Sequence, residues 1–248
     1  MGERRRLPHT ASGATIAGAL AIALSTAPPT AATPARCTLA AAPSHASAWR
    51  AYVPPSTPVR ARPASPAAHA PVTLAGSWLL VLATARGPGG ECLLQVRLDR
   101  RPNTAHGWVA ANRVRLVRTR WRIEISRARR RAVLRHAGRA VARWPVVVGA
   151  PATPTPRGLF ALQASYRSPA SSFEGTWILA LTAHSQILAT FDGGDGRVAL
   201  HGRGPASLID PLGSAASHGC IRFDNHAIAT IVRRVGRGQL PGIPVAIS

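Results

Sequence analysis

The sequence contains no lysine and few acidic residues. Its 31 basic residues are all arginine, against nine aspartate and glutamate residues, which gives a formal net charge of +22. An arginine bias beside abundant alanine, glycine and proline is what a GC-rich genome produces; the functional alternative is attraction to a polyanion, either nucleic acid or an anionic cell envelope. The chain has only four Phe and two Tyr and no basic-aromatic alternation, which argues against a base-stacking surface. We therefore predict no nucleic-acid partner.

The scarce carboxylates are scattered along the chain, which argues against a catalytic carboxylate pair and against a Mg²⁺ or Ca²⁺ site. The segment 192–196, Asp-Gly-Gly-Asp-Gly, is similar to a calcium-binding loop but lacks the downstream glutamate. We predict a glycine-rich hairpin turn there, and neither a metal nor a cofactor for the protein.

The first 32 residues have the pattern of a secretory signal. Arg4 to Arg6 precede an apolar run of small residues, 14–24, and Ser25-Thr26-Ala27 follow. The run is shorter than the ~20 residues that an ordinary membrane span needs. We predict an exported protein, located in the periplasm, the cell wall or the extracellular space. Residues 1–32 are either a cleaved signal peptide or an uncleaved N-terminal membrane anchor.

Export changes the interpretation of the three cysteines, Cys37, Cys92 and Cys220. In an oxidising compartment two cysteines are expected to form a disulfide, and an odd one remains as a reactive thiol. Cys37 and Cys92 both lie in the N-terminal half, whereas Cys220 lies alone in a Ser-His-Gly-Cys motif. We predict a Cys37–Cys92 disulfide and a free Cys220.

The chain between the signal and residue 118 divides into two parts. Residues 33–70 are rich in Pro, Ala, Ser and Thr and are predicted to be a linker or a loosely packed lead-in. Residues 71–118 hold short apolar runs with turns between them, which is typical of a small antiparallel β-barrel. These runs lie at 77–82, 92–98 and 106–116. Their end, Gly107-Trp108-Val109, resembles that of bacterial SH3-like domains, which often accompany cell-wall enzymes; a β extension packed on the next domain is the alternative.

Residues 119–248 are predicted to form a β-rich domain with one helix. The helix is expected between an N-cap at Asp224 and a C-cap at Gly236, because apolar residues recur at i, i+3, i+4 and i+7 from Ile228. Alternating or apolar runs predict the strands. They lie at 121–125, 132–134, 141–148, 159–162, 177–181, 187–191, 198–201 and 243–247.

The strongest chemical signal is Cys220 with two histidines near it in the sequence. A free thiol has a pKa of about 8.5, so only ~3% is thiolate at neutral pH, and a histidine within hydrogen-bond reach can activate it. His218 precedes Cys220 by two residues, and His201 precedes it by nineteen. Backbone N–H groups around Gly219 and Cys220 are candidates for an oxyanion hole. Arg222 is a candidate for binding a substrate carboxylate.

This combination resembles the signature of the YkuD-type L,D-transpeptidase family: His-Gly at 201–202, about fifteen residues, and then Ser-His-Gly-Cys-Ile-Arg at 217–222. The segment 153–160 is similar to the Thr-Pro-x-Gly-x-Phe segment of that family, and the Pro-Gly-Ile-Pro-Val ending is also similar. The resemblance covers about 120–248. It implies a mainly β protein, with a β-sandwich-like catalytic domain at 119–248 behind the small β-barrel-like domain.

The family acts on stem tetrapeptides of peptidoglycan. The resemblance implies that Cys220 attacks the stem to form a thioester and that His201 is the general base and acid. An amine of a second stem then resolves the thioester and cross-links two stems, whereas water as the acceptor would make the protein an L,D-carboxypeptidase. Carbapenem-type β-lactams are implied as covalent inhibitors, and the anionic cell wall as a partner.

The resemblance also implies supporting roles around this pair. His218 and Ser217 are expected to tune the oxyanion hole or substrate binding, and the carbonyl of Gly202 is expected to orient His201. Asp210-Pro211, between the two motifs, departs from the family pattern and is expected to reshape the cover over the site.

Two other classes stay open. A zinc site would use His201, His218 and Cys220, with His226 as a further ligand, although their spacing matches no zinc pattern. A non-catalytic cell-wall-binding protein would keep the fold without the reaction.

Overall fold

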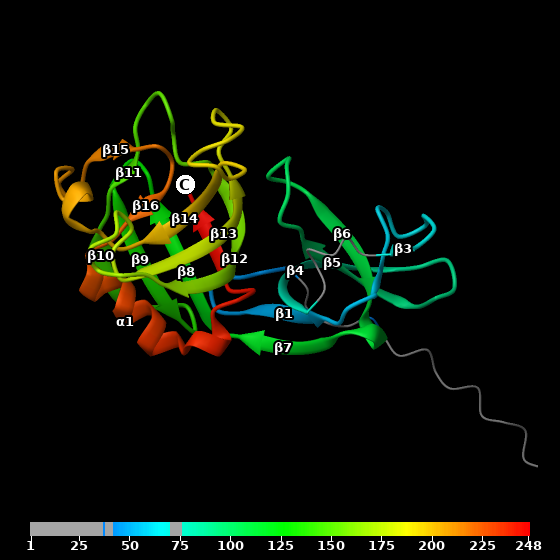
Figure 1. Ribbon diagram of the computed structural model, residues 1–248. Coiled ribbons are helices and arrows are strands. Elements are labelled where there is room, and N and C mark those ends of the chain that lie inside the picture. The colour runs from blue at the N-terminus through cyan, green and yellow to red at the C-terminus, as the bar shows by residue number, and fades with distance from the viewer. Residues whose placement is uncertain (1–36, 38–41, 70–75) are drawn as a thin grey trace, which may run out of the picture. The chain divides into compact units, whose positions relative to one another are not determined.

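The computed structural model describes Cys37, residues 42–69 and residues 76–248 (Figure 1). These residues form seventeen strands, one α-helix and short 3-10 turns. The predicted fold class, mainly β with one helix after Cys220, is confirmed. Within these same residues, no helix combines the length and the apolar character that crossing a membrane requires. The predicted signal, 1–32, lies outside the described residues.

The first sheet is built from five antiparallel strands in the order β6-β5-β4-β1-β7. Its strands are β1 (Ala48–Val53), β4 (Ser77–Arg86), β5 (Cys92–Arg97), β6 (His106–Ala110) and β7 (Arg115–Thr119). The predicted runs at 77–82, 92–98 and 106–116 correspond to β4, β5 and the β6–β7 pair, which a 3-10 turn connects. Apolar residues from alternate positions, such as Leu94, form a small core. Its assignment as an SH3-like domain stays a prediction.

The predicted lead-in, 33–70, contains one strand of this sheet. β1 pairs with both β4 and β7, and its residues Ala51 and Val53 are fully buried. The flanking Pro and Ser residues dominate the composition of this stretch and conceal a six-residue strand. A short hairpin of β2 (Pro58–Val59) and β3 (Ala68–His69) follows. We place β1 with the first sheet; the domain boundaries otherwise stay a prediction.

A disulfide joins Cys37 to Cys92, the first residue of β5, with their Cα atoms 5.3 Å apart. Cys220 is a free cysteine. The bond closes a loop of 55 residues. In the chain-entropy treatment, closing such a loop restricts the unfolded chain and stabilises the fold by about 4 kcal/mol.

The second sheet has eight strands in the order β10-β9-β8-β17-β12-β13-β14-β16. Its strands are β8 (Trp121–Ser126), β9 (Arg131–His136), β10 (Arg139–Pro145), β12 (Gly158–Arg167), β13 (Trp177–His184), β14 (Arg197–His201), β16 (Ile221–Arg222) and β17 (Pro244–Ile247). A separate parallel pair joins β11 (Val148–Gly149) to β15 (Ala215–Ser217). β16 runs parallel to β14, so the two sequence motifs at 201–202 and 217–222 lie side by side.

One predicted strand is wrong. Residues 187–191 belong to the loop 185–196, which connects β13 to β14. Ile187 and Phe191 are 60% and 47% exposed, so the apolar run does not enter the core. The Asp-Gly-Gly-Asp-Gly segment forms the predicted turn, in which Phe191 and Gly194 exchange backbone hydrogen bonds.

The predicted helix is α1 (Asn225–Val235), which packs against β13 and β14 (Figure 1). The carboxylate of Asp224 accepts the N–H of His226 at 2.8 Å and caps the first turn. Gly236 ends the helix with a φ of +84°. The face that carries Ile228 is buried in the main core, so the chain directly after Cys220 is held rigidly.

A short connection and several side-chain contacts join the two sheets. β7 leads into β8 after one residue. Ala48, Leu80 and Ala161 form a small shared core. The buried guanidinium of Arg50 donates to the carbonyl oxygens of Gln239 and Pro241 at 2.7 and 2.8 Å.

The disulfide predicts a simple labelling result. Alkylation of the unreduced chain in denaturant should modify one thiol, Cys220, because Cys37 and Cys92 form a disulfide. Reduction before alkylation should give three modified thiols, and intact mass reads both. Three labels without reduction would contradict the pairing.

Candidate active site

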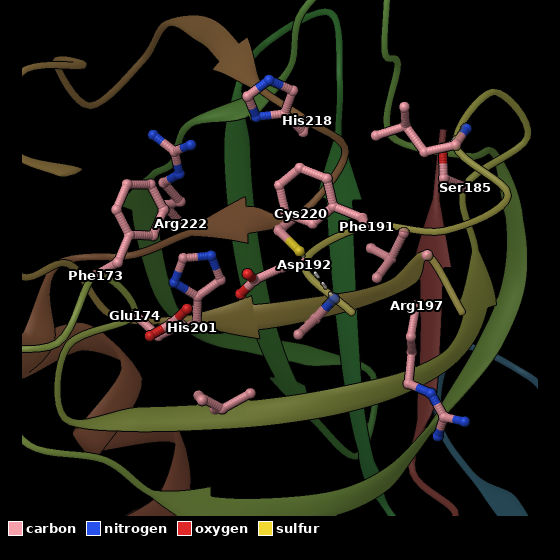
Figure 2. A pocket seen from close by; sticks show the side chains of 15 residues that line it. Phe173, Glu174, Ser185, Phe191, Asp192, Arg197, His201, His218, Cys220 and Arg222 are labelled. Carbon is pink, nitrogen blue, oxygen red and sulfur yellow. Dashed lines mark hydrogen bonds between the residues drawn. The ribbon is translucent and has the colours of Figure 1, made fainter. Parts of the chain in front are cut away.

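A cavity of about 600 Å³ lies where β14 ends and β16 begins. Figure 2 shows the side chains that line it, and Cys220, His201, His218 and Arg222 are among them. The rest of the wall comes mainly from β14 and from the loops before and after β13, 168–176 and 185–196. The fold thus brings both sequence motifs into one cavity.

Cys220 lies in the tight connection between β15 and β16. Gly219 before it has a φ of +120°, a conformation that residues with a side chain rarely adopt. The Cys220 sulfur accepts the backbone N–H of Ala199, on the neighbouring strand β14, at 3.4 Å. Burial raises the pKa of the Cys220 thiol above its ordinary value, although the bond from Ala199 acts in the opposite direction. The direction of this shift favours the protonated thiol.

Two hydroxyl groups hold the Cys220 segment in place. The Ser217 hydroxyl donates to the carbonyl oxygen of Cys220 at 2.6 Å and accepts the N–H of Gly219 at 3.2 Å. The buried Thr155 hydroxyl donates to the carbonyl oxygen of Gly219 and accepts the N–H of Gly149, both at 2.8 Å. The Gly219 N–H is thus occupied. The Cys220 N–H donates to no protein acceptor among residues 42–69 and 76–248, so it is available to a ligand.

His201, the last residue of β14, is held in one tautomer. Its Nδ1 lies 2.8 Å from the carbonyl oxygen of Gly202. Because a carbonyl can only accept, Nδ1 carries the proton and Nε2 is left to accept one. Burial lowers the pKa of His201 to about 4, against the opposing effect of the Gly202 bond. The imidazole is therefore neutral at physiological pH, with one nitrogen ready to act as a base.

Asn225 fixes the backbone next to His201. Its side-chain oxygen accepts the N–H groups of Thr176 and Arg203 at 3.1 and 3.2 Å, and its Nδ2 donates to the carbonyl oxygen of Arg203 at 2.8 Å. A Cβ at Gly202 would lie 2.1 Å from that side-chain oxygen, so this position requires glycine. The sequence analysis missed Asn225. Its signal in the sequence was its place at the first turn of the helix after the Cys220 motif.

His218 and Arg222 have different surroundings. The exposed His218 ring packs against Phe191, with ring centroids 5.1 Å apart. The buried Arg222 guanidinium pairs with Asp210 and lies 4.8 Å from the centre of the Phe173 ring. Asp210 belongs to the segment that departs from the family pattern, so this departure supplies a partner for Arg222. A substrate carboxylate would compete with Asp210, and binding of one by Arg222 stays a prediction.

The zinc site that the sequence left open is not assembled. His226 is exposed on the first turn of α1 and does not line the cavity. Across the described ranges, His, Cys, Asp and Glu side chains form no cluster of three or more that could hold a metal ion.

A profile of the L,D-transpeptidase catalytic domain, named YkuD, matches residues 120–247. The match spans just over half of the chain and includes both motifs of the cavity. The chain belongs to this family. The resemblance seen in the sequence is thereby confirmed, and the members of this family are cysteine-dependent transpeptidases.

No curated protein matches the sequence. Among solved structures, Bd1075 of Bdellovibrio bacteriovorus is 20% identical, with 52% of this chain and 48% of that chain covered and a TM-score of 0.39. An L,D-transpeptidase mutant of Enterococcus faecium is 17% identical, with 52% and 49% covered and a TM-score of 0.36. L,D-transpeptidase 3 from Mycobacterium tuberculosis, in complex with a faropenem-derived adduct, is 14% identical, with 69% and 91% covered and a TM-score of 0.41. The chain spans about half the length of the first two, and the family assignment rests on the profile.

The two pKa shifts predict how the thiol reacts with pH. Because burial raises the pKa of Cys220 and lowers the pKa of His201 to about 4, the resting pair is a neutral thiol and a neutral imidazole. The rate of Cys220 alkylation by iodoacetamide should rise with pH through neutrality and beyond the ordinary thiol pKa of about 8.5. The urea-unfolded chain, with its disulfide intact, is the control and should titrate at that ordinary value. A native rate that levels off near pH 6 would instead indicate a thiolate–imidazolium pair.

Proposed function

We propose that this protein is a peptidoglycan L,D-transpeptidase in which Cys220 is the nucleophile and His201 is the general base and acid. The observation that carries this proposal is the meeting, in one cavity, of a free thiol and a neutral imidazole whose Nδ1 is bound to Gly202. A neutral pair suits a mechanism in which the imidazole takes the thiol proton as the sulfur attacks, since the thiolate then forms only when it is used.

In the first half-reaction, the Cys220 sulfur attacks the carbonyl carbon between the third residue of a stem tetrapeptide and its terminal D-alanine. The thiol proton moves to Nε2 of His201, and the carbonyl oxygen becomes an oxyanion. The free N–H of Cys220 supports a role as the donor to this oxyanion. The intermediate then collapses, the C–N bond breaks, and His201 returns the proton to the leaving D-alanine amine. A thioester between Cys220 and the stem remains.

In the second half-reaction, an amine of a second stem attacks the thioester carbonyl. His201 accepts a proton from this amine, the C–S bond breaks, and the Cys220 sulfur leaves and regains its proton. The result is a peptide bond between two stems. Glu174 and Asp192, two of the nine acidic residues, line the cavity. Arg197 and Arg222 line the cavity as well, but each is paired with a carboxylate, of Asp99 and Asp210 respectively. The charge of Glu174 and Asp192 would therefore attract a cationic amine, which favours an amine over water as the acceptor.

The remaining site residues are proposed to act through this pair. Ser217 and Gly219 hold the Cys220 turn, and Gly202 orients His201. His218, with its ring on Phe191, and Arg222, with its ring contact on Phe173, shape the part of the cavity that receives the stem.

The location follows from the substrate, which lies outside the cytoplasm. We propose that the chain is exported to the periplasm, the cell wall or the medium, and the Cys37–Cys92 disulfide supports an oxidising compartment. The net charge of +22 suits an anionic wall as a partner. Carbapenem-type β-lactams present a strained acyl carbon to the same thiol and are proposed as covalent inhibitors. The 71–118 domain as an SH3-like wall-binding module belongs to the same proposal.

The nucleophile can be tested by mass. The wild-type chain incubated with a carbapenem, or with a defined tetrapeptide donor, should gain the mass of one acyl group. Cys220→Ala should gain none while unfolding at the same temperature, because the half-buried side chain lies at a cavity wall. An adduct on the variant would show that Cys220 is not the nucleophile. A wild type that forms no adduct would refute the proposed transpeptidase activity. Incubation with a tetrapeptide donor and an acceptor stem identifies the reaction by the mass of its products. A transpeptidase gives cross-linked dimers, and a carboxypeptidase gives trimmed tripeptides. A wall-binding protein without catalysis would give neither product.

The base can be tested by comparing two histidine variants. His201→Ala should slow thioester formation by about 10²- to 10⁴-fold, the usual loss when a general base is removed. His218→Ala is the matched control and should cost less, since the His218 ring is exposed and stacks on Phe191. Single-turnover acylation measures both. A larger loss in His218→Ala would reassign the base.

A further inference from the structure

The loop 185–196 forms one wall of the catalytic cavity. Ser185, Leu188, Phe191 and Asp192 of this loop all line it. Phe191, Cys220 and His218 line the same cavity (Figure 2), and the Phe191 ring packs against His218. The position of the loop therefore sets the shape of the cavity that receives a substrate.

The loop has few means of holding itself in place. The hydroxyl of Ser185 accepts the N–H groups of Ile187 and Leu188, and Phe191 and Gly194 close a tight turn. Ile187 and Phe191 are largely exposed, so the loop gains little from apolar burial. The Ser185 N–H also donates to the carbonyl oxygen of Gly196 at 2.8 Å and joins the two ends of the loop. The remaining contacts of the loop backbone come from another part of the chain.

Arg101 makes those contacts from the first sheet. It lies in the connection 98–105 between β5 and β6. Its guanidinium donates to three carbonyl oxygens of the loop: Asp195 at 2.6 Å, Ser185 at 3.0 Å and Leu188 at 2.9 Å. The planar guanidinium has several donors in a fixed arrangement, so one side chain can hold three backbone positions at once.

Asn103, from the same connection, holds the start of the loop. Its amide exchanges two hydrogen bonds with the backbone of His184, the last residue of β13: Nδ2 donates to the carbonyl oxygen, and Oδ1 accepts the N–H, both at 2.8 Å. This two-bond pattern resembles the pairing of a neighbouring strand, and it fixes the direction in which the chain leaves β13.

Asp99 holds the other end of the loop. Its carboxylate pairs with Arg197, the first residue of β14, at 2.6 Å, and the Asp99 side chain is only 3% exposed. Arg197 also lines the cavity. Nearby, the His184 Nε2 lies 3.0 Å from the carboxylate of Asp195. Asn103 thus contacts the residue before the loop, Arg101 contacts three positions within it, and Asp99 contacts the residue after it.

We propose that the segment 99–103 of the first sheet is a clamp that positions the cavity wall, with Arg101 as its principal positioning residue. The part of this proposal that concerns acyl transfer rests on the proposed function. The N-terminal β unit is then part of the active site's support, in addition to any binding to the cell wall. The clamp acts through the loop 185–196 and touches neither the thiol nor the imidazole.

The experiment compares Arg101→Ala with Arg100→Ala in the full chain. Arg100 is the adjacent, exposed arginine and makes no hydrogen bond or ion pair with residues in the described ranges, so it controls for the loss of charge. Hydrogen exchange of the backbone amides in 185–196 is measured first, because it requires no activity. In Arg101→Ala the amides of this loop should exchange faster than in the wild type, whereas those of α1 should exchange at the wild-type rate. In Arg100→Ala both sets of amides should exchange at the wild-type rate.

The second readout is acylation of Cys220 by a carbapenem at several concentrations. Arg101→Ala should lower the second-order rate constant by about 10- to 100-fold, the scale of loss when a distant change misplaces reacting groups. The loss should appear mainly as a higher half-saturating concentration. Alkylation by the small reagent iodoacetamide should not slow, since it needs no cavity wall. Equal exchange in both arginine variants, or a parallel loss of acylation and alkylation, would overturn the clamp.

The outcomes separate this proposal from the proposed function. If the wild type forms no acyl adduct, the transpeptidase fails, while the exchange data still decide the clamp. If Arg101→Ala does not fold, Asn103→Ala removes two of the contacts without removing a charge. It should increase exchange at the start of the loop, and an unchanged loop would overturn the clamp.

Discussion

The parallel pairing of β14 with β16 is the contact on which the active site depends. Its register sets His201 opposite Arg222 and Leu200 opposite Ile221. Cys220, one residue before β16, therefore reaches the edge of β14, where the Ala199 N–H meets its sulfur. α1 follows at once and buries its apolar face against β13 and β14. The thiol and the imidazole are thus positioned by sheet pairing and by the core, and not by each other.

Backbone groups orient the catalytic side chains at this site, a role that carboxylates have at many other sites. The carbonyl oxygen of Gly202 fixes the tautomer of His201, and the free N–H of Cys220 points to a donor for an oxyanion. Both need a close approach of the main chain, which Gly202 and Gly219 allow. The use of backbone groups in place of carboxylates agrees with a chain that has only nine acidic residues. Glu174 and Asp192 line the cavity beside Arg197 and Arg222, so its wall carries both signs of charge within a strongly basic protein.

The two β units share more than a covalent link. A small apolar core, the bonds from Arg50 and the contacts of segment 99–103 all cross between them. The last set ends on the loop 185–196, whose apolar residues are exposed and whose polar backbone is held by side chains from the other unit. This arrangement explains why the apolar run 187–191 does not form the predicted strand. The Leu188 carbonyl accepts from Arg101, the N–H groups of Ile187 and Leu188 donate to the Ser185 hydroxyl, and Phe191 pairs with Gly194.

The sequence by itself determined the mainly β fold class, the helix that begins after Asp224, the turn at 192–196 and the family motifs around His201 and Cys220. These features depend on local periodicity, capping and turn chemistry, which neighbouring residues express directly. The tertiary structure alone decided that 48–53 is a strand, that Asp210 pairs with Arg222, and that the Gly219 N–H is occupied. The partners in the first case are distant in the chain, and in all three the outcome depends on where folding brings the backbone. A sequence pattern carries no record of that position, because a strand pairing, a hydrogen bond or an ion pair that depends on the folded backbone leaves no period and no spacing behind it.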